Sequence, residues 1–205
     1  RERGLEPLAG LIMAQQTVYD PTLPVVAESY VDAEKGVETV EDAINGAMDI
    51  IAENISDDAD IRRRLRSLFT VAGVLQSRAA DSEKESVYTM YYEYDEPVNK
   101  IAGHRVLAVN RGENEGFLKV GIDVDRIKAL NIINANVLSD NSSACTDIVR
   151  DAAADAYDRL IFPSVEREIR NMITDSAVES ALKVFYVNLR ELLLQPPVKG
   201  KRALG

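Results

Sequence analysis

The chain has 205 residues, a formal net charge of −10 at pH 7 and a hydrophobic fraction of 46%. This length is enough for one sizeable core or two small ones. The single cysteine, Cys145, and the single histidine, His104, argue against an internal disulfide and against a zinc site. No run of 18 apolar residues is present, so we expect a cytoplasmic protein without a membrane span.

The first third of the chain is predicted to be helical. Apolar residues at spacings of three and four indicate helices over residues 6–18, 25–31, 39–55 and 57–75. The last of these carries Arg62, Arg63 and Arg66 away from its apolar stripe. We interpret these arginines as a solvated face that forms ion pairs along the helix, because such faces are common. Contact with the phosphates of a nucleic acid is the alternative.

Half of the eight tyrosines lie between Glu83 and Tyr94. Their spacing predicts a helix whose aromatic faces pack into a core. Stacking on unpaired bases is the competing interpretation. We favour core packing.

The middle of the chain contains the least generic segment. Pro97 fits the first turn of a short helix, and Gly103 can start the next. Gly112 and Gly116 flank an acidic turn, and alternation after it predicts a short strand over residues 117–122. The segment 98–121 is locally basic and supplies the candidate nucleic-acid-binding residues Lys100, His104, Arg105, Arg111 and Lys119.

Two interpretations of Arg105 and Arg111 stay open. In the structural one, which we favour, their guanidinium groups cap helix ends and pair with carboxylates such as Glu113 or Glu115. In the other, they bind a phosphate backbone with His104 close by. The same alternatives apply to Arg62, Arg63 and Arg66.

The last third is again predicted to be helical. Helices are expected over residues 123–138 and 146–161, and Pro163 should end the second of them. A short helix should follow over residues 165–173. Thr174 or Asp175 should cap a final helix, and Pro196 should stop it and open a basic linker. The predicted buried stripe of this final helix is Ala181, Phe185, Leu189, Leu192 and Leu193.

These patterns together predict an all-α, multihelical chain with at most one short β element near residues 117–122. We expect small helical subdomains packed in sequence order, over residues 1–82, 83–140 and 141–195, followed by the linker 196–205. No phosphate-binding glycine loop and no set of catalytic residues appear. We therefore expect no enzyme activity, no cofactor and no metal.

Several stretches of the chain resemble the bacterial Tex family of transcription accessory proteins. The main one is His104-Arg105-x-Leu107-Ala108-x-x-Arg111-Gly112-Glu113-x-Glu115-Gly116. Residues 155–170 and 184–197 agree with the family as well, and the order of the stretches is the same. One departure is the pair Ala102-Gly103, where the family usually has a small residue or proline and then serine.

The resemblance implies a multihelical region, one part of which is helix-turn-helix-like. In the family it precedes a resolvase-like domain of RNase H fold, then helix-hairpin-helix and OB-fold RNA-binding domains. We therefore expect an excised, monomeric scaffold region that orients those RNA-binding domains and adds weak contacts of its own to RNA or DNA. The alternative is an acidic helical module that docks onto transcription machinery.

Overall fold

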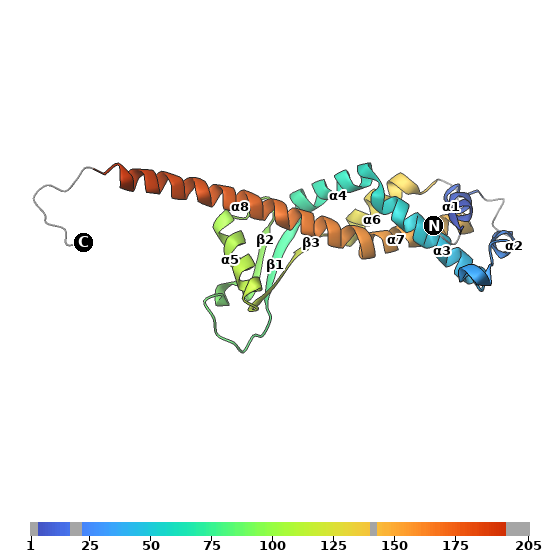
Figure 1. Ribbon diagram of the computed structural model, residues 1–205, viewed down its shortest axis with the longest axis horizontal. Coiled ribbons are helices and arrows are strands. Elements are labelled where there is room, and N and C mark those ends of the chain that lie inside the picture. The colour runs from blue at the N-terminus through green and yellow to red at the C-terminus, as the bar shows by residue number, and fades with distance from the viewer. Residues whose placement is uncertain (1–3, 17–21, 140–142, 196–205) are drawn as a thin grey trace, which may run out of the picture. The chain divides into compact units, whose positions relative to one another are not determined.

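The computed structural model describes residues 4–16, 22–139 and 143–195, so the expected basic linker 196–205 lies outside the described residues. The described chain is mostly helical with one small sheet, which confirms the multihelical fold class (Figure 1). It divides into two compact units. Unit 1 contains Arg1–Val74, Pro97–Asn99 and Ile122–Ile169, and unit 2 contains Leu75–Glu96, Lys100–Gly121 and Arg170–Gly205. Both units are discontinuous in sequence; the division into consecutive segments stays a prediction.

Unit 1 is built from helices. In chain order they are α1 (Glu6–Met13), α2 (Leu23–Glu28), a 3₁₀ turn (Ala33–Lys35), α3 (Val40–Asp57), α4 (Ala59–Ala72), α6 (Arg126–Val137) and α7 (Ala144–Asp155). α3 packs against α1, α2 and α7, and α4 packs against α6. Fully buried side chains such as Leu8, Ile12, Ile51 and Leu65 form the core of the unit.

The starts of α3 and α4 are fixed by side-chain caps. Thr39 Oγ1 accepts a hydrogen bond from the backbone N–H of Asp42 at 3.1 Å, and the Asp42 carboxylate accepts one from the Thr39 N–H at 3.0 Å. Asp58 Oδ1 accepts from the N–H of Ile61 at 2.8 Å. These caps satisfy backbone donors that the first helical turn leaves free. The predicted starts of these two helices are thereby confirmed.

Unit 2 combines a three-stranded sheet with helices. The strands are β1 (Val74–Ala79), β2 (Glu93–Pro97) and β3 (Leu118–Asp123), in the order β2-β1-β3. Val74, Pro97, Ile122 and Asp123, at the strand ends, belong to unit 1. Ala79 N donates to Tyr92 O and Val98 N donates to Gly73 O, so β1 and β2 run antiparallel. Ala80 N donates to Phe117 O at the start of β3. β3 lies where the sequence predicts a strand; β1 and β2 are additional.

α5 (Gly103–Asn114) covers this sheet through a small core. Leu75, Tyr88, Tyr91, Val109 and Leu118 are its buried members. Gly112 allows the close contact, because a Cβ there would lie 2.6 Å from Leu118 Cδ1 and 3.0 Å from Tyr88 Cδ1. The expectation that the tyrosines pack into a core is confirmed for Tyr88 and Tyr91, which are 6% and 8% exposed.

The helix predicted over residues 83–94 is wrong. This segment contains turns, a 3₁₀ turn (Thr89–Tyr91) and the start of β2. A single 3₁₀ turn also places residues i and i+3 on one side, so the spacing of Tyr88 and Tyr91 fits it as well as a helix. Pro97 accordingly ends β2 instead of opening a helix.

The predicted break at Pro163 is also wrong. α7 continues through a π-helical segment (Ala156–Ile161) into α8 (Phe162–Leu193). The wider π turn lies directly before Pro163, where a regular helix would require the N–H that proline lacks. The predicted cap at Thr174 or Asp175 therefore lies inside a continuous helix, and Thr174 Oγ1 donates instead to Arg170 O at 2.7 Å.

Candidate functional site

The three candidate arginines of unit 1 lie on α4 and have partners within that unit. Arg62 donates to Ser56 O and to Ser164 Oγ, both at 3.0 Å. Arg63 pairs with Asp60 at 2.8 Å, as neighbouring charges on one helix face commonly do. Arg66 pairs with Glu168 at 3.0 Å. Contact of these residues with phosphate stays a prediction.

In unit 2, Lys100 lies three residues before α5, and His104 and Arg105 lie in its first turn. Arg105 donates to Glu96 Oε1 at 3.0 Å and to Tyr94 Oη at 3.3 Å. Burial raises the pKa of Tyr94, and its hydrogen bond with Glu96 raises it further. Burial also acts to raise the pKa of Glu96, but hydrogen bonds from Tyr94 and Arg105 outweigh it, so the Glu96 pKa is lowered.

The remaining two candidates of unit 2 lie apart along the chain. Arg111, near the end of α5, pairs with Glu115 at 3.1 Å, and its side chain is 76% exposed. Lys119 is exposed on β3. Among the described residues, Lys100 and Lys119 are the candidates of unit 2 whose ammonium groups have neither an ion pair nor a hydrogen bond to protein. Whether any of these residues binds phosphate stays a prediction.

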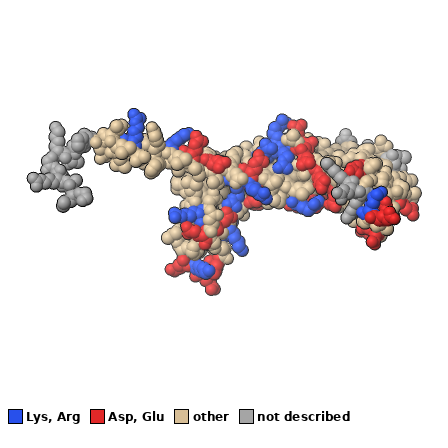
Figure 2. Space-filling model, viewed as in Figure 1, with Lys and Arg blue, Asp and Glu red and all other residues tan. Residues whose placement is uncertain are grey.

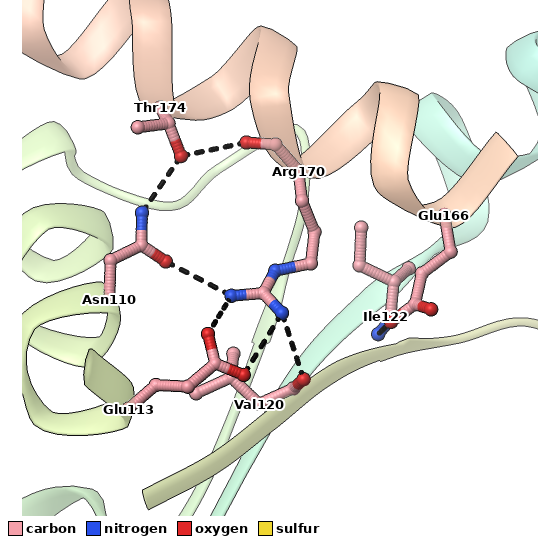
Figure 3. Close-up of polar contacts among 7 residues, drawn as sticks. All are labelled: Asn110, Glu113, Val120, Ile122, Glu166, Arg170 and Thr174. Atoms are coloured by element: carbon pink, nitrogen blue, oxygen red, sulfur yellow. Dashed lines mark hydrogen bonds and ion pairs between the residues drawn. The ribbon is translucent and has the colours of Figure 1, made fainter. Parts of the chain in front are cut away.

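A denser polar network in unit 2 joins α5, β3 and α8, as Figure 3 shows. Arg170 of α8 donates to Glu113 Oε1 at 3.1 Å, to Val120 O at 3.1 Å and to Asn110 Oδ1 at 3.2 Å, and it also pairs with Glu113 Oε2. Asn110 Nδ2 in turn donates to Thr174 Oγ1 at 2.8 Å. The Arg170 and Glu113 side chains are 23% and 32% exposed.

The sequence analysis missed this network. Asn110 and Glu113 are three residues apart on α5, and Arg170 and Thr174 are four apart on α8, so each pair shares a helix face. The only available signal was that both faces carry polar side chains with several hydrogen-bonding groups. Nothing in the local pattern shows that residues about 60 positions apart meet.

A close backbone approach supports the same contact between α5 and α8. A Cβ on Gly103 would lie 3.1 Å from Ala177 Cα and 3.2 Å from Ala177 Cβ. Two small residues therefore face each other at this crossing. In unit 1, a separate contact of α8 involves β3: Glu166 Oε1 accepts from the Ile122 N–H at 3.0 Å (Figure 3).

Beyond Ala177, α8 has no buried residue in the described chain. Figure 1 shows this end of the helix running past α5 and the sheet within unit 2. Its large apolar side chains are between 41% and 76% exposed. With Leu194, which directly follows the helix, they form what we call the exposed α8 surface: Val178, Leu182, Val184, Phe185, Tyr186, Val187, Leu189, Leu192, Leu193 and Leu194.

The predicted stripe of the last helix is therefore present but uncovered. Its members Ala181, Phe185, Leu189 and Leu192 recur at spacings of four, four and three, as in a helix face that packs on a partner. Val184 and Val187 lie outside this stripe. A contiguous apolar surface of this extent is typical of an interaction surface.

Among the described residues, no three His, Cys, Asp or Glu side chains gather as metal ligands would. Over the same residues, every helix is too short or too polar to cross a bilayer.

Comparison with known proteins decides the family. The family model described as Tex central region-like matches residues 20–185. The chain belongs to the Tex family. It is 44% identical to the uncharacterized protein YdcI of Bacillus subtilis (strain 168), over the whole chain and 29% of that protein.

Two further relatives have names that refer to a function. The transcriptional accessory protein Tex of Neisseria gonorrhoeae is 29% identical over the whole chain and 27% of its own length. The S1 RNA-binding domain-containing protein 1 of Pongo abelii is 31% identical over 83% of the chain and 19% of its own length. The chain thus spans less than a third of each of these family members.

Proposed function

We propose that this chain is a scaffold region of a nucleic-acid-associated transcription accessory protein. In this proposal, the exposed α8 surface is where other parts of such a protein pack. The observation that carries the proposal is that α8 is anchored through Arg170 and through Ala177, which faces Gly103 of α5, and is uncovered beyond Ala177.

The distribution of apolar side chains favours cover from several sides. The consecutive residues Val184, Phe185, Tyr186 and Val187 are all exposed, and at about 100° per residue they point around most of the helix circumference. A helix that is apolar around most of its circumference is typically enclosed in a larger core, whereas a two-stranded coiled coil covers one narrow seam. Segments of the same polypeptide can provide such cover, since the relatives named above are more than three times as long as the matched region.

The nucleic-acid part of the proposal is supported by the names of the relatives, which refer to transcription and to RNA binding. We propose that most of this binding belongs to regions outside the present chain, because the chain carries a net charge of −10. Lys100 and Lys119 are then the best placed to add weak contacts. The isolated chain should bind single-stranded RNA or duplex DNA with a Kd of about 10⁻⁴ M or weaker at physiological salt. Binding as tight as that of a full-length family protein in the same titration would contradict this.

We also propose that the chain has no catalytic activity of its own. The supporting observation is that Cys145 is fully buried in unit 1, whereas His104 is exposed in unit 2. A nucleophile shielded from solvent is poorly suited to attack a substrate.

A second candidate function is an acidic protein-interaction module that binds a basic surface of the transcription machinery. The net charge favours it. This function does not require other parts of the protein to pack on the exposed α8 surface, whereas the scaffold function does.

The scaffold proposal is tested by the double substitution Leu182→Ser/Leu189→Ser. Both side chains are exposed here, so the free energy of unfolding of the 205-residue chain should change by less than about 0.5 kcal/mol. In a full-length family protein that contains this region, the same change should cost about 2 kcal/mol or more per site, since it would remove buried methyl groups. Val25→Ser, at a position that is 67% exposed on α2, is the control. Equal, small effects in both proteins would overturn the proposal.

A further inference from the structure

The segment joining β1 to β2 has the features of a second, separate docking surface. We propose that it binds a basic protein segment that presents an apolar side chain. The inference rests on the second candidate function, binding of a basic partner, and assigns it a place in unit 2. It shares no residue with the exposed α8 surface, so the two can be tested independently.

Two apolar side chains of this segment are held outward. Val87 is 86% exposed and Met90 is 73% exposed, whereas the neighbouring Tyr88 and Tyr91 are buried in the core of the unit. The backbone between them is fixed further by Ser86, whose Oγ accepts from the Tyr88 N–H at 3.1 Å and lies 3.0 Å from Tyr92 Oη. Val87 and Met90 are thus presented by an ordered frame.

A hollow lies beside these residues. Its volume is about 530 Å³, and it is open to solvent on one side, as a surface groove for a side chain is. Ala79, Met90 and Tyr92 supply apolar parts of its lining, and Arg78 and Glu93 supply charged parts. Arg78 is already paired with Asp95 at 2.8 Å, which leaves Glu93 as a charged group available to a partner.

The segment that contributes to the hollow is acidic. Residues 81–96 contain six carboxylate side chains and a single lysine. Glu83, Glu85 and Glu93 are exposed and, in the described chain, form no ion pair, whereas Asp95 and Glu96 pair with Arg78 and Arg105. Figure 2 shows acidic atoms at this end of unit 2, at the bottom of the view, with some basic atoms among them.

This charge selects the occupant. A nucleic acid or an anionic membrane would be repelled by the carboxylates, and a second copy of this chain carries a net charge of −10 itself. Lysine or arginine side chains of a partner can reach Glu83, Glu85 and Glu93. An apolar residue between them can contact Val87 and Met90 and enter the hollow.

The proposal is tested with three labelled peptides of equal length: alternating Lys and Leu, alternating Lys and Ser, and alternating Glu and Leu. Fluorescence polarisation at low salt should show that the Lys–Leu peptide binds at least about tenfold more tightly than either of the others. In NMR spectra of the chain, addition of the Lys–Leu peptide should change the amide chemical shifts of residues 82–93. Equal binding of the Lys–Leu and Glu–Leu peptides would overturn the proposal.

Matched variants locate the site. Glu83→Gln/Glu85→Gln/Glu93→Gln should weaken binding of the Lys–Leu peptide by at least about tenfold. Glu28→Gln/Glu34→Gln/Glu38→Gln, which removes three exposed carboxylates from unit 1, should leave it unchanged. Val87→Ser/Met90→Ser should also weaken it, and Val25→Ser should not.

The exposed α8 surface provides the distinguishing control. Leu182→Ser/Leu189→Ser should leave binding of the Lys–Leu peptide unchanged if the surface between β1 and β2 is the site. Loss of binding in that variant, with no effect of the substitutions at Glu83, Glu85 and Glu93 or at Val87 and Met90, would overturn the inference and leave the scaffold proposal standing.

Discussion

Glu113 and Glu115, two residues apart in unit 2, have very different surroundings. Glu113 accepts two hydrogen bonds from Arg170 in a network that joins α5 to α8, whereas Glu115 pairs with Arg111, whose side chain is 76% exposed. A partly buried, bidentate carboxylate pair is worth more than an exposed pair. The anchoring of α8 in unit 2 therefore depends on Glu113.

Glu113→Gln should lower the free energy of unfolding by about 1–3 kcal/mol, because it weakens a charge-assisted pair and leaves Arg170 partly unpaired. Glu115→Gln is the matched control and should change it by less than about 0.5 kcal/mol. Urea unfolding followed by circular dichroism measures both. Equal effects of the two substitutions would show that the network does not anchor α8.

Tyr157 is a residue whose burial has a measurable consequence. It is 2% exposed in the π-helical segment, and its hydroxyl has no hydrogen-bond partner among the described residues. Burial and, to a smaller extent, the charge of Asp158 raise the Tyr157 pKa to about 12. The unfolded chain has an ordinary tyrosine pKa near 10, so the folded state loses stability as the pH rises from about 10 to about 12.

Tyr157→Phe should therefore flatten the fall in stability above pH 10. At neutral pH it should raise the free energy of unfolding by about 1 kcal/mol, because it removes an unsatisfied buried hydroxyl. Urea titrations at several pH values measure both effects. Tyr186→Phe, at an exposed position on α8, should leave the profile unchanged. If the free energy of unfolding of Tyr157→Phe falls with pH as it does in the unsubstituted protein, the raised pKa of Tyr157 does not cause the loss of stability.

At the scale of elements, the sequence predicted those whose causes are local. Thr39 and Asp58 mark the starts of α3 and α4 because a cap depends on residues three positions away. Gly103 starts α5, and the alternation after Gly116 marks β3, for the same reason.

The elements that were missed depend on distant partners or on rare geometry. The tyrosine spacing near Tyr88 is compatible with a helix and with a 3₁₀ turn, and pairing with β1 decides between them. Pro163 does not end the helix because a π turn precedes it, which periodicity does not reveal. The Arg170 network likewise joins residues that are far apart in sequence.

At the scale of the whole molecule, periodicity identified the apolar stripe at the end of α8, but it could not show whether anything in this chain covers it. The candidate basic residues are a similar case: the sequence located them, but their ion-pair partners, Glu96 for Arg105 and Glu168 for Arg66, come from other elements. In the scaffold proposal, the remaining parts of longer family proteins pack on the exposed apolar residues at the end of this helix.

Hydrogen–deuterium exchange of the α8 amides tests this claim most directly. The rates for residues 178–193 should be compared between the 205-residue chain and a full-length family protein that contains it, with the buried part of α3 as the internal reference. The scaffold account predicts exchange at least about tenfold slower in the full-length protein over residues 178–193 and little change in α3. Equal rates over residues 178–193 in the two proteins would contradict it.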